Sequence, residues 1–226
     1  GALTSANQQL GNVEGLISTT LSGLTDVSNT MSSARDVLVK LADGNTQGTQ
    51  RTQYVQQYQS LLANIQTFFQ DADYNGKTLI GNMSGSAGTF GGVAVVRNEV
   101  GATYGIGTFG GSAFYGSINF TSTQLNSATT VAGLIGTGTG ATFINMVNSL
   151  GNELNTYGAA ANYVSNQITY NSDKMTAMQN GLGALVDANL AQESAMLTSL
   201  QIRQQLGTQA LQIANQAPNS LLSLFR

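Results

Sequence analysis

Apolar and polar positions follow a repeating seven-residue pattern along the first forty residues. Apolar side chains recur at every seventh residue, and a second series lies between them. The two series are Leu3, Leu10, Ile17, Leu24, Met31 and Leu38, and Ala6, Val13, Thr20, Val27, Ala34 and Leu41. This heptad spacing predicts one long helix that packs against other helices. Because Leu16, Leu21 and Val37 widen the apolar stripe, we expect more than one partner helix.

A second helix is predicted after a short turn. The turn residues of Asp43–Gly48 end the first helix. The second helix is expected over residues 51–71, and its buried face is Val55, Tyr58, Leu62, Ile65 and Phe69. Asn75 and Gly76 then predict another turn.

The composition changes between residues 81 and 141, where Gly, Ser and Thr dominate. Short β-like runs occur at residues 91–98, 103–109 and 117–122. These runs predict a small, Gly-rich β insertion. Because Gly weakens strands, we expect its strand register to be weak.

Heptad spacing returns after residue 142. The two series are Phe143, Leu150, Tyr157, Val164, Asn171, Met178 and Leu185, and Val147, Leu154, Ala161, Ile168, Met175 and Leu182. Asn171 is the one polar member, and a polar residue in such a seam commonly fixes register or partner number. Gly181 and Gly183 weaken the helix, so we expect a domain joint within Asn180–Leu185.

These elements predict a mainly α fold with a long antiparallel helical bundle or coiled-coil core. A long helix standing alone does not offset the entropy of ordering its backbone, so the first and last long helices are expected to need each other. The expected parts are core helices and turn at 1–80, the outer insertion at 81–141, a returning core helix at 142–183 and a carboxy-terminal helix at 184–226.

Charge excludes two classes of partner. Charged residues make up 8% of the chain, against about 25% in typical soluble domains. The net charge is −3, and the eight basic residues are scattered. Nucleic acids and anionic membranes need clustered Lys and Arg, so neither is expected as a partner. The chain also contains no run of about 20 apolar residues, so no membrane span is predicted.

The chain lacks several of the side chains that enzymes use most often for catalysis. The chain has no Cys, His or Trp, which excludes thiol nucleophiles, imidazole bases and zinc sites built from nitrogen or sulfur. Asp71 and Asp73 are the candidate carboxylate pair, but neighbouring acids in a turn are typically solvated or cap a helix. The stretch Gly133–Phe143 resembles a phosphate-binding loop but does not meet the G-x-G-x-x-G spacing. We therefore expect no catalytic, cofactor or metal site.

The carboxy-terminal segment poses a different question. Residues 204–226 carry Leu, Ile and Phe at helical spacing, at an end of the chain where most proteins fray. Such a segment is expected to be buried by something outside the chain. The alternative is a helix that folds back onto the rest of the molecule.

Several motifs of this segment resemble the bacterial flagellins, in particular those of alphaproteobacteria. The ending shows Gly207-Thr208, then Ala214-Asn215-Gln216-Ala217-Pro218, then Leu222-Ser223-Leu224. Upstream, Asp187, Ala191 and Glu193 match an acidic family pattern, from which Asn189 departs. The turn Tyr74–Ile80 resembles the turn after the second core helix of the family. The resemblance covers about residues 1–80 and 142–226.

The resemblance implies a structural subunit of the flagellar filament that polymerises through terminal helices for motility. It implies an extracellular location after secretion without a cleaved signal peptide. The implied partners are further copies of the chain, a flagellar export chaperone, and cap and junction proteins. The family has an amino-terminal helix before the first one seen here, and its absence is expected to leave the carboxy-terminal helix without an intrachain mate. The residues expected in polymerisation are Leu197, Leu200, Leu206, Gly207, Leu211, Ala214, Asn215, Gln216, Leu221, Leu222 and Leu224.

Three alternatives stay open. Arg35 and Asp36 match part of a family region that contacts the next subunit and an animal innate immune receptor, although Ser33 replaces a basic residue there. A surface glycan-binding protein would use the aromatic residues of the insertion, Tyr104, Phe109, Phe114, Tyr115 and Phe120, for which a core role is the competing interpretation. A hook–filament junction protein of the same superfamily is the third alternative, and the ending of the chain favours flagellin over it.

Overall fold

A computed structural model of the chain describes the backbone of residues 1–224 and the side chains of residues 1–214. It contains two compact units, Gly1–Ser172 and Asp173–Arg226. The first unit holds the packed core, and the described residues of the second belong to one long helix.

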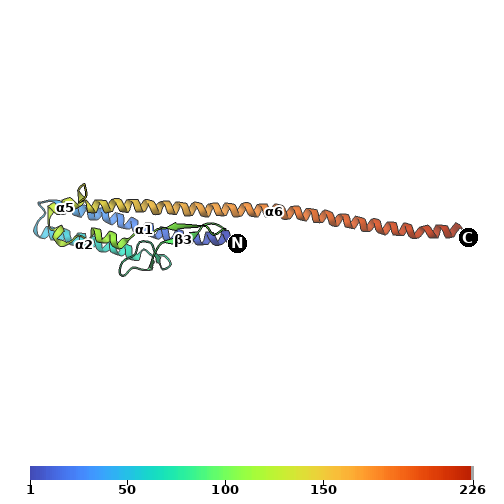
Figure 1. The fold of residues 1–226 in the computed structure, drawn as a ribbon, viewed down its shortest axis with the longest axis horizontal. Coiled ribbons are helices and arrows are strands. Elements are labelled where there is room, and N and C mark those ends of the chain that lie inside the picture. Colours follow the sequence, from blue (N-terminus) through green and yellow to red (C-terminus); the bar gives the residue numbers. More distant parts are fainter. Residues whose placement is uncertain (225–226) are drawn as a thin grey trace. The chain divides into compact units, whose positions relative to one another are not determined.

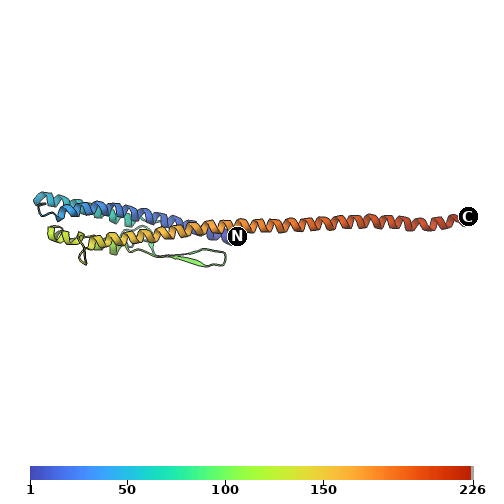
Figure 2. The same ribbon diagram turned by 90° about the horizontal axis from the view of Figure 1, so that it is seen from above.

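Two antiparallel helices form the base of the first unit. They are α1, Ala2–Ala42, and α2, Gly48–Asp71, which lie side by side in Figures 1 and 2. Every residue of the two heptad series of α1 is buried, as predicted. The expected buried face of α2 is also confirmed, and Arg51 joins it.

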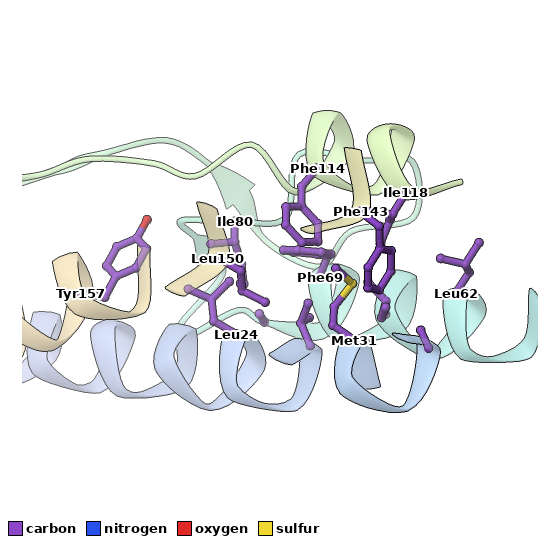
Figure 3. Close-up of a cluster of buried hydrophobic side chains, with 14 of the residues drawn as sticks. Leu24, Met31, Leu62, Phe69, Ile80, Phe114, Ile118, Phe143, Leu150 and Tyr157 are labelled. Carbon is purple, nitrogen blue, oxygen red and sulfur yellow. The ribbon is translucent and has the colours of Figure 1, made fainter. Parts of the chain in front are cut away.

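The third long element is α6, Thr142–Leu224, whose residues up to 172 belong to the first unit. Phe143, Leu150, Tyr157, Val164 and Asn171 are buried, as their heptad series predicts. Figure 3 shows where the layers meet: Leu24 from α1, Phe69 from α2 and Leu150 from α6 belong to one apolar cluster. The bundle therefore has three long helices around a shared core.

The insertion between α2 and α6 contains short strands and short helices. The strands are β1, Lys77–Thr78, β2, Thr89–Phe90, β3, Val93–Val96, and β4, Thr103–Ile106. The helices are α3, Gly111–Ile118, α4, Ser122–Leu125, and α5, Ala128–Ile135. β1 and β2 pair in parallel, and β3 and β4 form an antiparallel hairpin. Figure 2 shows the hairpin lying along the bundle toward the start of α1.

The sequence predicts two of the three β-like runs correctly. The runs at 91–98 and 103–109 contain β3 and β4. The strand expected at 117–122 is wrong, because α3 ends at Ile118 and α4 begins at Ser122. Phe114 and Ile118 are four residues apart and both buried, which is the spacing of one face of a helix. Much of the insertion is therefore helical rather than β-rich.

The joint expected within Asn180–Leu185 does not interrupt the helix. α6 continues through Gly181 and Gly183 without a break. The boundary between the two compact units lies upstream of these glycines, between Ser172 and Asp173.

Candidate functional site

The second unit exposes an unusual amount of apolar surface. All side chains from residue 176 to residue 214 are exposed. We call its large apolar members the α6 apolar surface: Met178, Leu182, Leu185, Val186, Leu190, Met196, Leu197, Leu200, Ile202, Leu206, Leu211 and Ile213. Leu206 is 59% exposed and Leu211 is 63% exposed. Apolar patches of this extent usually mark an interaction site.

The α6 apolar surface occupies two sides of the helix. Leu182, Leu200 and Leu211 lie in one row, because 18 and 11 residues are close to whole numbers of turns at 3.6 residues per turn. Ile202 and Ile213 lie in a second row. Since Ile202 follows Leu200 by two residues, or about 200° around the helix, the second row is on the opposite side. A helix with two apolar rows can contact two partner helices at once.

Charge is sparse on the same segment. Between residues 176 and 214 the charged side chains are Asp187, Glu193 and Arg203. Packing the apolar rows against another apolar helix would therefore remove few charges from water, and taking charges out of water is costly. The segment is suited to helix–helix association through apolar burial.

The structure locates most of the expected polymerisation residues on this segment. Leu197, Leu200, Leu206 and Leu211 are exposed members of the α6 apolar surface, and Gly207 and Ala214 are also exposed. The remaining expected residues lie outside the described side chains: Asn215, Gln216, Leu221, Leu222 and Leu224. Sequence reasoning missed Ile202 and Ile213, although their spacing of 11 residues was a visible signal.

Arg35 and Asp36 lie on the outer face of the first unit. Both are exposed on α1, and Val39, one turn later, is 53% exposed. The pair is therefore accessible for contact with another molecule. Its role in binding a subunit or a receptor stays a prediction.

The acidic and glycine-rich candidates form no assembled site. Asp71 and Asp73 flank the end of α2, where the Asp73 amide donates to the Asp71 carbonyl over 2.8 Å. Within the described residues, no group of three His, Cys, Asp or Glu side chains is placed to hold a metal ion. The glycine-rich stretch connects α5 to α6 and includes Gly138 with a φ of 106°, a conformation that Gly adopts readily.

The aromatic residues of the insertion contribute to the core. Phe114 and Phe120 are buried, and their rings lie 5.6 Å from Phe69 and 6.0 Å from Tyr58 respectively. Tyr104 stacks on Tyr163 of α6 at 4.0 Å between ring centroids. For Phe114 and Phe120, the core interpretation is confirmed over a sugar-binding face.

Among the described residues, no helix is both long enough and apolar enough to cross a membrane.

Comparisons with known proteins place this architecture in context. A family model described as "Bacterial flagellin C-terminal helical region" matches residues 142–225. Flagellin FljJ of Caulobacter vibrioides is 30% identical over 202 residues, which cover 88% of this chain and 70% of that protein. Flagellin FljM of the same organism is 48% identical over 75 residues, or 33% of this chain and 28% of that protein. The chain thus matches less than a third of the length of FljM.

Two solved structures share the fold. The crystal structure of Bacillus cereus flagellin aligns with a TM-score of 0.61 at 15% identity, covering 73% of this chain and 88% of that one. A putative flagellar hook-associated protein from Vibrio parahaemolyticus aligns with a TM-score of 0.62 at 15% identity, covering 77% and 87%. At this identity the alignments establish the fold alone.

Proposed function

Since this chain belongs to the flagellin family, we propose that it is a structural subunit of the bacterial flagellar filament and acts in motility outside the cell. The resemblance predicted from the terminal motifs is confirmed at the level of the family and of its alphaproteobacterial members. The observation that carries the proposal is the α6 apolar surface, exposed on two sides of one helix. The proposed role needs no catalytic site, cofactor or metal ion.

The two apolar rows of α6 suggest how copies of the chain would assemble. If one row of each copy packs against a different surface of its neighbour, the contact is heterologous. A heterologous contact whose rotation does not close into a ring generates a helical filament, and the proposed role requires this geometry. Burying a Leu or Ile side chain contributes about 1.5–3 kcal/mol. Nine of the twelve residues of the α6 apolar surface are Leu or Ile, and their burial between neighbouring copies would favour association.

Further partners follow from the proposed role. We propose that the chain is secreted without a cleaved signal peptide, with an export chaperone that binds it before assembly and cap and junction proteins at the ends of the filament. Arg35 and Asp36 are proposed to contact a neighbouring copy, with the innate immune receptor as the competing partner. A reporter-cell assay of the purified chain against a stimulatory flagellin distinguishes the two.

A hook–filament junction protein is the second candidate, since a putative flagellar hook-associated protein shares the fold of this chain. The two functions predict different copy numbers. A filament subunit is found along the whole filament, whereas a junction protein is confined to its base. Immunogold labelling of isolated filaments decides between them.

The filament proposal is tested by placing a charge on either apolar row. We expect Leu211→Asp and Leu206→Asp, made in the complete gene, to abolish filaments seen by electron microscopy, because an unpaired carboxylate would be buried in the contact. Far-UV circular dichroism of the purified variants should retain the helicity of the bundle. Gln205→Asp is the matched control, since it adds the same charge between the rows. Normal filaments from both leucine variants would refute the proposal.

A further inference from the structure

A buried amide lies near the end of the first unit, in a seam that is otherwise apolar. Asn171 of α6 is fully buried. Its Nδ2 donates to Asn7 Oδ1 over 2.8 Å and to the Arg97 carbonyl over 3.0 Å. Its Oδ1 accepts from Gln167 Nε2 over 3.0 Å. Both amide hydrogens and the oxygen are therefore used, and the partners come from α1, the β3–β4 turn and α6.

Asn7 completes the connection from α1. Its Nδ2 donates to the Ile168 carbonyl and to Ser172 Oγ, each over 3.2 Å. Together with the bond from Asn171 Nδ2, three hydrogen bonds join Asn7 to α6. The groups are neutral, so the connection does not depend on ionisation.

The β3–β4 turn is fastened at the same place. The Arg97 carbonyl accepts from Asn171, and Arg97 Nη1 donates to the Tyr163 hydroxyl over 3.3 Å. Within the hairpin, the Arg97 amide donates to the Ala102 carbonyl over 2.8 Å. Tyr104 of β4 stacks on Tyr163. The hairpin therefore touches α6 through two independent kinds of contact near Asn171.

The apolar seams leave the register of α6 on α1 open to error. A shift of α6 by seven residues, about 10 Å along the axis, replaces each seam residue with the next member of the same series. Most replacements exchange one apolar side chain for another, so the shifted arrangement keeps much of its apolar burial. The loop Gly136–Gly140 before α6 is rich in Gly and offers little resistance to such a shift. The seams alone thus distinguish poorly between neighbouring registers.

We propose that Asn7 and Asn171 form a register lock, which selects one alignment of α6 on α1 and fixes the β3–β4 turn to that alignment. In a shifted register the amide of Asn171 would face apolar side chains without its partners, and an unpaired buried amide is strongly disfavoured. The lock therefore penalises the alternatives that the heptads permit. The assignment is independent of the filament function.

The absence of cysteine from the chain provides a direct measurement of register. Cysteines introduced at the exposed positions Asn29 of α1 and Asn162 of α6 carry spin labels, whose separation is measured by pulsed electron resonance. The two sites are offset along the bundle axis, so a heptad shift changes the separation by up to about 10 Å. We expect one separation in the parent. The double variant Asn7→Leu, Asn171→Leu should show a second, displaced separation.

Thr20→Val is the matched control. Thr20 is also a buried polar seam residue, but its hydroxyl donates to the Leu16 carbonyl within its own helix over 2.8 Å. Its loss should leave a single separation. A single, unshifted separation in the double leucine variant would overturn the register lock.

The milder pair Asn7→Ala and Asn171→Ala tests the lock if the leucine variants do not fold. Trypsin cleavage after Arg97 should be several-fold faster in Asn171→Ala than in the parent, because the Arg97 carbonyl loses its donor, and unchanged in Thr20→Val. Urea unfolding gives the factor by which each substitution lowers the folding equilibrium constant. Because the two amides are hydrogen-bonded to each other, the factor for the double variant should be smaller than the product of the two single factors. Unchanged cleavage, or effects that simply multiply, would show that the amides do not act as one unit.

Discussion

Arg51 is a charged side chain buried at the end of the α1–α2 hairpin. Its guanidinium donates to the carbonyls of Leu41 and Thr46, over 2.7 Å and 2.9 Å, and to that of Leu125 in α4 over 2.6 Å. A fourth, longer bond of 3.4 Å reaches the Asp43 carbonyl. Arg51 thus ties the end of α1 and the following turn to the insertion. The planar fork of a guanidinium is suited to several acceptors at once.

Removal of this guanidinium should destabilise the first unit. We expect Arg51→Met to lower the free energy of unfolding by about 2–4 kcal/mol, because buried carbonyls would lose their donor. Urea unfolding followed by circular dichroism measures the change. Arg35→Met on the exposed face of α1 is the control and should stay within about 0.5 kcal/mol of the parent. Equal effects of the two substitutions would contradict the role assigned to Arg51.

Two glycines of α3 give an opposed pair of substitutions. A Cβ at Gly111 would collide with the Ile80 carbonyl and the Phe69 ring, whereas one at Gly116 would meet nothing within 4 Å. We expect Gly111→Ala to cost about 1–3 kcal/mol of stability through overpacking. Gly116→Ala should add up to about 1 kcal/mol through helix propensity. Thermal unfolding of the two variants should shift in opposite directions, and shifts in the same direction would count against the close packing of α3.

Two tyrosines connect the helices to the insertion at the scale of elements. The Tyr58 hydroxyl of α2 donates to the Ile118 carbonyl at the end of α3 over 2.6 Å. The Tyr157 hydroxyl of α6 donates to the Gly107 carbonyl after β4 over 3.0 Å. Burial raises the pKa of both phenols, and the Glu153 carboxylate raises that of Tyr157 further. Both connections therefore depend on the neutral phenol.

These raised pKa values predict a loss of stability at alkaline pH. Tyrosines of the unfolded chain lose their proton near pH 10, while the folded state keeps Tyr58 and Tyr157 protonated. Their contribution is therefore complete below pH 10 and decreases above it, by about 1.4 kcal/mol per pH unit for each tyrosine. Urea unfolding at about pH 8 to 11, a range that spans the ordinary tyrosine pKa of about 10, measures how the free energy of unfolding changes with pH.

Substitution by Phe separates the contributions. Tyr58→Phe and Tyr157→Phe should each make the alkaline slope shallower, whereas Tyr170→Phe, at a position 62% exposed, should leave it unchanged. An identical slope in all three variants would show that the decline has another source.

The helices were predictable from sequence because their apolar residues repeat over many turns. The helix from Leu3 to Leu41 and its buried face could be predicted without knowing which residues pack against them. The insertion was less predictable, since its elements are short and their residues face neighbours far away in the sequence. Phe120, for example, lies in an expected strand, but it packs on Tyr58 of α2. Arg51 was missed as a polar residue, although it lies four residues before Val55 on the buried face of α2.

The candidate site was predictable in part at the scale of the whole molecule. The terminal motifs predicted an assembly role for the segment that contains Leu206 and Leu211, and both side chains are exposed. Sequence alone did not show that both rows are exposed, because a list of apolar positions does not show which of them are covered by other residues. That required the exposure of Ile202 and Ile213 in the folded chain.

Hydrogen exchange should distinguish the two compact units in unassembled protein. We expect slow exchange for the amides of residues 10–41, which lie in the packed core, and fast exchange for residues 176–214. Helices without packed side chains open at little cost. On assembly the second segment should become protected. Slow exchange of residues 176–214 before assembly would mean that the α6 apolar surface is already covered within one molecule.

The scarcity of charge between residues 176 and 214 has a consequence for the conditions that a polymer of this chain tolerates. Dissolved ions screen the attraction between charges, but they have little effect on contacts that are formed by apolar side chains. Moderate changes in sodium chloride should therefore leave such a polymer intact. Cooling should destabilise the polymer more than salt does, because the hydrophobic effect weakens as the temperature falls.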